Sequence, residues 1–301
     1  MLGICQDSIL VHWSRRECRM GKQTESVWIP EVRPTDTAVV HESAMFRVLS
    51  AMLERGTIGR DHSLLVVFGG EFDRAVIAEL AFTNVSLSNI SNAVGDLHFD
   101  ARAFPFPDNS FDHVIAHAGL HHCSRPHQAV CEMYRVSKKS VIFFESQDSW
   151  MMRLAIRMGM TVDYEWNAIL DHRLQRGGVD DLPVPNYVYR WTRREVEKLV
   201  RSLDPGHVPH LNFTVQWDFT YKRVMRRLQR TPLRFFPSWL LSGSCRAVLA
   251  TFNLLFSSYG NVFAVRIERS QTEQPWMKDG VFVPPFQVQS SEAGSCEHEV
   301  S

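Results

Sequence analysis

The sequence predicts an α/β fold in which a mostly parallel sheet carries helices on both faces. Residues 64–68 form a continuous apolar run, typical of a strand buried on both faces. Two further apolar runs, 113–118 and 140–144, are separated by the helical pattern of 124–137. Because strands and helices alternate, a parallel sheet is favoured, with ligands bound beyond the carboxyl ends of its strands.

The chain leads into this sheet through a helix. Residues 1–40 show no clear hydrophobic period and are expected to be a loosely structured lead-in. Residues 41–56 carry apolar side chains at helical spacing, and Gly56 is a suitable stop. After the strand at 64–68, a glycine turn and a new helical pattern follow at once. A strand, turn and helix in this order present backbone N–H groups to a ligand.

The later elements follow from similar patterns. Residues 83–89 are expected to form a second strand, and the methionine-rich stretch 151–158 a helix packed on the core. Residues 176–189 are rich in glycine and proline, which predicts a loop able to help cover a site. Strands are predicted at 210–219, which alternates with period two, and at 261–268.

Between those two strands, residues 219–258 are predicted to be a helical insertion. No acidic residue stands between Asp218 and Glu268, and basic residues cluster at helical spacing over 222–234. A solvated helix face followed by a packed helix is the plainer interpretation. The alternative is that 222–241 contacts anionic lipid headgroups or a lipid-linked phosphate.

The C-terminal part of the chain and the overall composition narrow the range of possible functions. A capping box at Thr192 and Glu195 predicts a helix start, and residues 271–301 are expected to be a disordered tail. The formal net charge is zero, which argues against a nucleic-acid partner. Six cysteines without C-x-x-C spacing, no signal pattern and no apolar run of about 18 residues predict a cytoplasmic protein without a membrane span.

One segment carries a family resemblance. It reads D-A-x-x-F-P-F-P-D-N-S-F-D-H-V-I-x-x-x-x-L-H-H from Asp100, followed by P-H-Q-A-V-x-E-M-Y-R-V and a strand ending in Glu145. With the glycine turn, residues 61–146 resemble the cofactor-binding core of class I S-adenosylmethionine (SAM)-dependent methyltransferases of the type 11 group. The resemblance implies a Rossmann-like sheet with a last antiparallel strand pair, in one methyltransferase domain over 41–270.

The resemblance also implies which residues bind SAM. The set is Gly69, Gly70, Glu71, Ser88, Ser91, Asp100, Ala101, His117, Ala118 and Gly119. The glycine turn would hold the methionine part, and Asp100 with Ala101 the adenine. Two features depart from the family pattern. No further small residue stands at Phe72 or Asp73, and no carboxylate follows the second strand, so a weaker neutral partner such as Ser88 would meet the ribose.

The candidate catalytic residues are His121, His122 and Glu145. Methyl transfer from a sulfonium is an in-line displacement, so the protein supplies positioning and, for a weak nucleophile, a base. Histidine titrates near neutral pH and suits a hydroxyl acceptor, although these histidines could equally shape the pocket. The neighbouring histidines and cysteine fit no zinc spacing, so no metal is predicted.

The sequence therefore predicts a SAM-dependent methyltransferase acting on a small or lipid-linked acceptor. Oxygen is the preferred accepting atom, with nitrogen and carbon left open. The alternative is a weak or inactive protein of the same fold that acts as a binding or regulatory subunit, since the ribose carboxylate is missing. A nicotinamide-dependent oxidoreductase is disfavoured by the segment 104–112.

Overall fold

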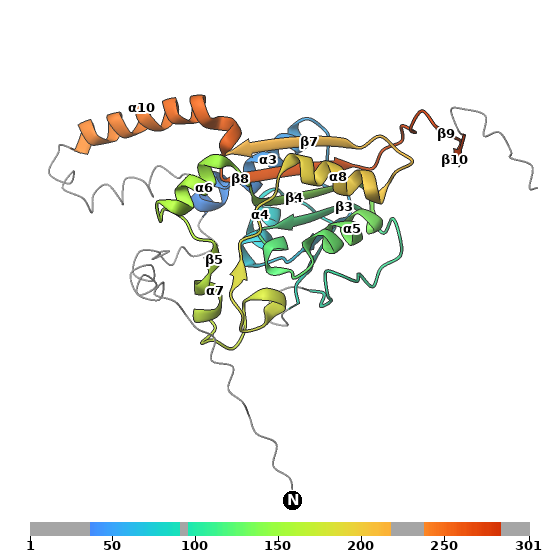
Figure 1. Cartoon of the computed structure of the whole chain (residues 1–301), viewed down its shortest axis with the longest axis horizontal. Helices are drawn as coiled ribbons and strands as arrows, with labels where there is room; N and C mark the ends of the chain where they lie inside the picture. The colour runs from blue at the N-terminus through green and yellow to red at the C-terminus, as the bar shows by residue number, and fades with distance from the viewer. Residues whose placement is uncertain (1–36, 91–95, 218–237, 284–301) are drawn as a thin grey trace, which may run out of the picture.

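A computed structural model describes residues 37–90, 96–217 and 238–283 (Figure 1). Its centre is a six-stranded sheet with the order β2-β1-β3-β4-β8-β7. In that order the strands are Val85–Ser88, Leu64–Val67, Phe111–His117, Ser137–Ser146, Val262–Glu268 and His210–Gln216. β1 to β4 pair in parallel, whereas β8 runs antiparallel to both β4 and β7. This confirms the predicted fold class, including the antiparallel last pair.

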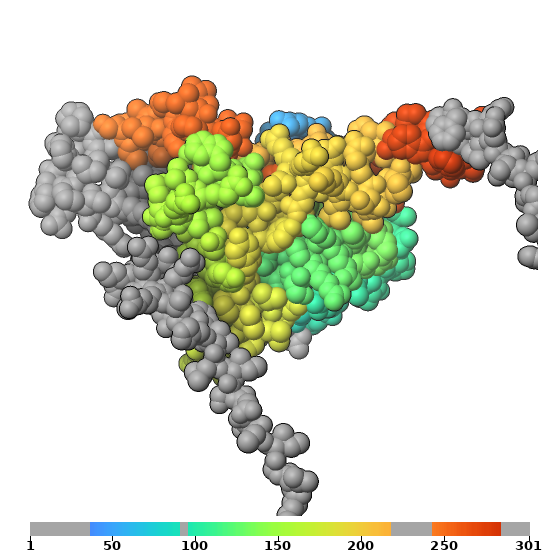
Figure 2. All heavy atoms as spheres, in the orientation of Figure 1, coloured from blue at the N-terminus to red at the C-terminus, as the bar shows by residue number. Residues whose placement is uncertain are grey.

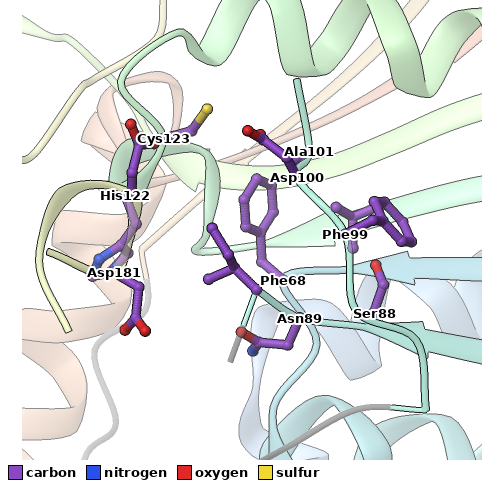
Figure 3. Close-up of a pocket in the computed structure, with 12 residues that line it drawn as sticks. Phe68, Ser88, Asn89, Phe99, Asp100, Ala101, His122, Cys123 and Asp181 are labelled. Carbon is purple, nitrogen blue, oxygen red and sulfur yellow. The ribbon is translucent and has the colours of Figure 1, made fainter. Parts of the chain in front are cut away.

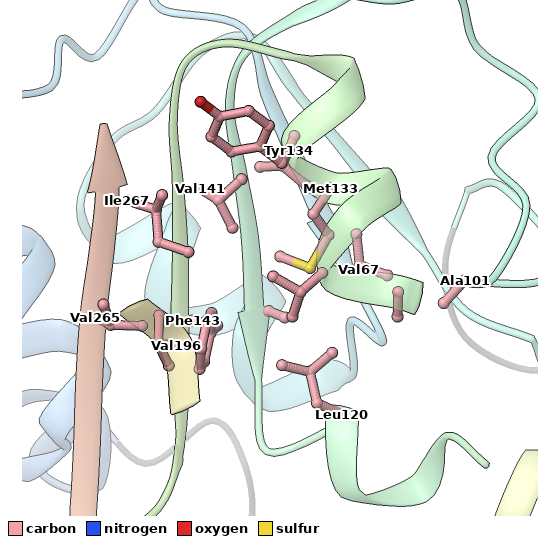
Figure 4. Packing of buried hydrophobic residues seen from close by; sticks show 14 of the residues in the cluster. Val67, Ala101, Leu120, Met133, Tyr134, Val141, Phe143, Val196, Val265 and Ile267 are labelled. Carbon is pink, nitrogen blue, oxygen red and sulfur yellow. The ribbon is translucent and has the colours of Figure 1, made fainter. Parts of the chain in front are cut away.

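Helices cover both faces of the sheet because its strands are apolar on both sides. One face packs on α5 (Pro126–Val136) and α8 (Arg193–Leu203), as the buried side chains in Figure 4 show. The other packs on α3 (Ala44–Glu54) and α4 (Glu71–Glu79). In β1, Leu65 and Val67 belong to the first cluster and Leu64 and Val66 to the second, as strand alternation requires.

Two helix starts show how local sequence sets the element ends. The capping box of α8 forms as predicted: the Glu195 N–H donates to Thr192 Oγ1 at 3.1 Å, and the Thr192 N–H to Glu195 Oε2 at 3.4 Å. The helix expected over 41–56 is divided into α2 (Thr37–Glu42) and α3. The cause is Ser43, which is extended and accepts a hydrogen bond from the Phe46 N–H, so it caps a new helix.

The chain between β4 and α8 folds back over the carboxyl ends of the strands. It contains α6 (Trp150–Arg157), α7 (Trp166–Leu170) and the 3-10 turn η3 (Val179–Asp181). It also contains a small antiparallel pair, β5 (Tyr164–Glu165) with β6 (Asn186–Tyr187). Both β6 and η3 contact the 3-10 turn η2 (Leu120–His122) that follows β3. The loop predicted at 176–189 therefore lies against the site residues.

The C-terminal part differs from the prediction in one place. Within the expected disordered tail, β9 (Met277–Lys278) pairs with β10 (Val281–Phe282) in a hairpin. Asp279 and Gly280 both have positive φ, as a two-residue hairpin turn requires. Of the predicted insertion, α10 (Ser238–Phe256) and η5 (Ser257–Tyr259) are described, while the basic stretch 222–234 lies outside the described residues.

No helix in the described part of the chain has both the length and the apolar character needed to cross a membrane.

Candidate functional site

A small pocket, partly open to solvent and with a cavity volume of about 40 Å³, lies beyond the carboxyl ends of β1 and β2. Figure 3 shows side chains converging on it from the sheet, from the segment after β2 and from the covering loop. Its lining consists of Val67, Phe68, Ser88, Asn89, Ile90, Phe99, Asp100, Ala101, His122, Cys123, Asp180 and Asp181. Four of the predicted site residues, Ser88, Asp100, Ala101 and His122, are among them.

The glycine turn after β1 is held to β2 by its own peptide groups. The Gly69 N–H donates to the Ser88 carbonyl at 2.8 Å, and the Gly69 carbonyl accepts from Asn89 Nδ2 at 3.0 Å. The Gly70 N–H donates to Asp73 Oδ2 at 2.7 Å, which starts α4. Glu71 is exposed on the first turn of that helix. Gly69, Gly70 and Glu71 thus border the pocket without lining it.

Phe68 occupies the position between β1 and the glycine turn. Its φ of 60° lies in the left-handed region, which side chains other than glycine seldom adopt. The side chain packs on Gly119, where an added Cβ would stand only 2.3 Å from the Phe68 Cβ. In Figure 3 the ring stands in the middle of the pocket. It therefore fills the space between the end of β1 and the segment after β3.

The predicted residues His117, Ala118 and Gly119 lie at the end of β3 and directly after it. His117 Nδ1 stands 2.8 Å from Asp73 Oδ1, so β3 and α4 are joined by this pair. Ala118 has a φ of 47°, and its N–H donates to the Phe144 carbonyl at 2.9 Å. His117, Ala118 and Gly119 do not line the pocket.

The opposite wall comes from the segment after β2. The Asp100 carboxylate accepts from Arg102 Nη2 at 2.6 Å and from Arg102 Nε at 2.9 Å, and these hydrogen bonds hold the pKa of Asp100 below its usual value. Arg102 Nη1 also donates to Asp180 Oδ2 at 2.8 Å, which fixes the covering loop to this wall. Ala101 is buried, and the Ser88 hydroxyl lies 3.4 Å from the Val66 carbonyl oxygen. Ser91 lies outside the described residues.

The three candidate catalytic residues come together at the ends of β3 and β4. Glu145 is 3% exposed and accepts hydrogen bonds from the Leu120 N–H and from His121 Nδ1, both at 2.7 Å. A second carboxylate, Glu165 of β5, stands 3.5 Å from His121 Nε2 and 3.4 Å from His122 Nε2. Asn186 Nδ2 of β6 donates to Glu165 at 3.2 Å and fixes it there.

These contacts shift the pKa values of His121 and His122 in opposite directions. Burial lowers the pKa of His121, but Glu145 and Glu165 outweigh it and raise that pKa to about 10. Burial, and then the charge of His121, lower the pKa of His122. Burial raises the pKa of Glu165, but hydrogen bonding to His121 and its charge outweigh this and lower it to about 2. The two carboxylates thus favour the protonated form of His121, which has no lone pair with which to act as a base.

Several site residues were not predicted from the sequence. Glu165 and Asn186 belong to two-residue strands, which are too short to show a period. Arg102 and Asp180 meet across 78 positions of the chain. Phe68 could have been found, since a bulky residue directly before two glycines stands where a turn with positive φ is expected.

Comparison with known proteins gives one family match and several structural likenesses. Residues 65–144 match the type 11 methyltransferase domain family. Among solved structures, a SAM-dependent methyltransferase from Archaeoglobus fulgidus is 9% identical, with 74% of this chain and 94% of that chain covered and a TM-score of 0.41. One from Aquifex aeolicus is 11% identical, with 83% and 98% covered and a TM-score of 0.39. A putative methyltransferase from Bacillus halodurans is 15% identical, with 73% and 96% covered and a TM-score of 0.37. No curated protein matches the chain in sequence.

Proposed function

We propose that this chain, whose residues 65–144 match the type 11 methyltransferase domain family, transfers the methyl group of SAM to a small or lipid-linked acceptor. The observation that carries the proposal is the pocket at the carboxyl edge of the sheet. One wall has the groups that a nucleoside needs, and the other has His122. SAM supplies the electrophilic methyl group, and the residues of the chain bind and orient the reactants.

The residues present fit the nucleoside part of SAM. The Asp100 carboxylate can accept from an exocyclic amine, and the Ala101 N–H can donate to an adenine ring. Ser88 and Asn89 lie at the end of β2, where a ribose would meet neutral partners. The methionine part is fitted less well, because Phe68 fills the space between the glycine turn and Gly119. Its ring has to turn away before the whole cofactor can enter.

The acceptor side is assigned from geometry. His121 uses Nδ1 toward Glu145 and faces Glu165 with Nε2, so it orients and neutralises the carboxylates. His122 lines the pocket and is the imidazole that an acceptor hydroxyl can reach. Oxygen is the preferred accepting atom because a hydroxyl needs such a base, whereas an amine does not.

A lipid-linked acceptor is supported by exposed apolar side chains on α6 and α10. Trp150 of α6 packs on Tyr259 at 5.5 Å between ring centroids, so α6 lies beside the end of α10. Figure 2 shows the two elements on one side of the molecule. Their exposed apolar residues include Trp150, Leu154, Val248, Leu254 and Leu255. Such a surface, with no acidic residue in either helix, suits a lipid interface.

The ring of Phe68 also favours a second candidate, a non-catalytic protein of the same fold. Calorimetric titration with SAM and with its demethylated product separates the two. For the enzyme, both ligands bind, and Asp100→Asn weakens binding by about tenfold, the equivalent of one charge-assisted hydrogen bond. The matched control is Asp108→Asn, which alters an exposed carboxylate outside the pocket and should change nothing. If neither the wild type nor Phe68→Gly binds either ligand at millimolar concentration, the enzyme proposal is wrong and the non-catalytic role is the one supported.

A further inference from the structure

Three potential metal ligands converge beside the pocket. They are His121 and His122 of η2 and Glu165 of β5, and their ligand atoms all lie within 4.8 Å of one another. Two imidazoles and one carboxylate are a donor set that zinc uses at sites with an open fourth position. The two histidines are adjacent in sequence, and the carboxylate arrives from a distant strand pair, so no linear zinc motif could reveal the set.

Two of the distances between ligand atoms are long for hydrogen bonds and match those around a bound ion. Glu165 Oε2 stands 3.5 Å from His121 Nε2 and 3.4 Å from His122 Nε2. A charge-assisted hydrogen bond between these groups would be near 2.8 Å. By contrast, a tetrahedral ion with bonds of about 2.1 Å holds its ligand atoms about 3.4 Å apart. Two edges of the site therefore already have the length that an ion requires.

Two of the three ligands are also held in place by a neighbouring polar group. Glu145 accepts from His121 Nδ1 at 2.7 Å, which leaves Nε2 of that ring to face Glu165. Asn186 Nδ2 donates to Glu165 Oε2 at 3.2 Å. Metal-bound histidines usually have such a carboxylate or backbone partner on the other ring nitrogen.

The charges of the cluster favour a cation. Glu145 is buried, whereas the Glu165 side chain is 34% exposed. Among the described residues, neither forms an ion pair with a lysine or arginine. His121 already pairs with both carboxylates, so a divalent ion that takes the place of its Nε2 proton would keep positive charge between them.

We propose that His121, His122 and Glu165 bind one divalent transition-metal ion, with Zn²⁺ as the best match, and that its fourth position opens toward the pocket. An oxygen donor, such as a hydroxyl or carboxylate, is the ligand class for that position. This donor could belong to the methyl acceptor, an extension that rests on the proposed function. In that case His122 would be a metal ligand and not a general base, and the ion would activate the acceptor oxygen.

The test is calorimetric titration of the full chain, without a histidine tag, with Zn²⁺ after chelator treatment. Co²⁺ is titrated in parallel, because tetrahedral Co²⁺ has intense visible absorption. The wild type should bind one equivalent of either ion. His122→Gln and Glu165→Gln, both at partly exposed positions, should each weaken binding by more than ~100-fold, and Glu145→Gln, behind His121, by ~10–100-fold.

The matched control is His41→Gln. His41 pairs with Glu79 at 2.7 Å on the surface, so it is another histidine–carboxylate pair but without a third ligand. This variant should bind Zn²⁺ as the wild type does. Unchanged affinity in His122→Gln and Glu165→Gln, or no binding to the folded wild type at submillimolar Zn²⁺, would overturn the site. Because SAM binding is measured separately, loss of the metal site would leave the methyltransferase proposal standing.

Discussion

Replacing Phe68 by glycine tests whether its ring controls entry of the cofactor. The change removes the side chain that fills the space beside Gly119 and gives the backbone a residue suited to a φ of 60°. Opening this space should strengthen SAM binding by at least tenfold, or about 1.4 kcal/mol. Calorimetric titration of wild type and variant measures this directly.

The stability of the same variant can be estimated from two opposing effects. Phe68 is only partly buried against the core, so loss of its packing should cost about 2 kcal/mol. Removing the strain of a left-handed backbone at this residue should stabilise the folded state by about 1 kcal/mol. The net destabilisation of about 1 kcal/mol corresponds to a fall in Tm of roughly 1.5–2 °C for a chain of this size.

Phe68→Ala is the matched control, since it removes the ring but keeps a Cβ in the left-handed region. It should gain the same affinity for SAM as Phe68→Gly, yet be about 1 kcal/mol less stable. If neither variant binds SAM more tightly than the wild type, the ring does not restrict the pocket. If the two variants are equally stable, the backbone at this position is not strained.

Three further predictions concern the rest of the molecule. Burial is the largest cause that lowers the pKa of His113 from 6.5 to about 4. Between pH 6.5 and pH 4, His113 is therefore protonated in the unfolded chain but not in the folded protein. Stability should fall by about 3 kcal/mol as the pH drops through this window, and urea unfolding of His113→Asn should lack that part of the decline. Thr192→Ala should lower stability by about 1 kcal/mol through loss of the α8 cap, seen as a lower melting temperature, and an unchanged melt would contradict the cap. Leu254→Ser with Leu255→Ser should reduce co-sedimentation with anionic vesicles, whereas Val281→Ser, an exposed apolar residue on the hairpin, should not; equal losses would argue against an α10 contact.

The sheet could be predicted because its signals are local. The buried runs at β1 and β4 and the capping box of α8 are each readable within a few residues. The meeting of His121 with Glu145 also follows from topology. β3 and β4 are parallel neighbours, so residues at or just after their carboxyl ends come together.

The remaining parts of the site depend on contacts that no local pattern encodes. Glu165 reaches the histidines only because β5 pairs with β6, and both strands have two residues. The clamp from Arg102 to Asp180 likewise depends on how the covering loop folds back. The hairpin turn at Asp279 and Gly280 did have a local signal, but the polar tail composition around it favoured disorder.

The central claim, that the pocket beyond β1 and β2 binds SAM, is tested most directly by hydrogen–deuterium exchange with saturating demethylated cofactor. The account predicts slower exchange in the turn at 68–71, in the segment 96–102 and around His122, with little change in the hairpin at 277–282. Absence of protection in the first three regions, or protection confined to other parts of the chain, would contradict it.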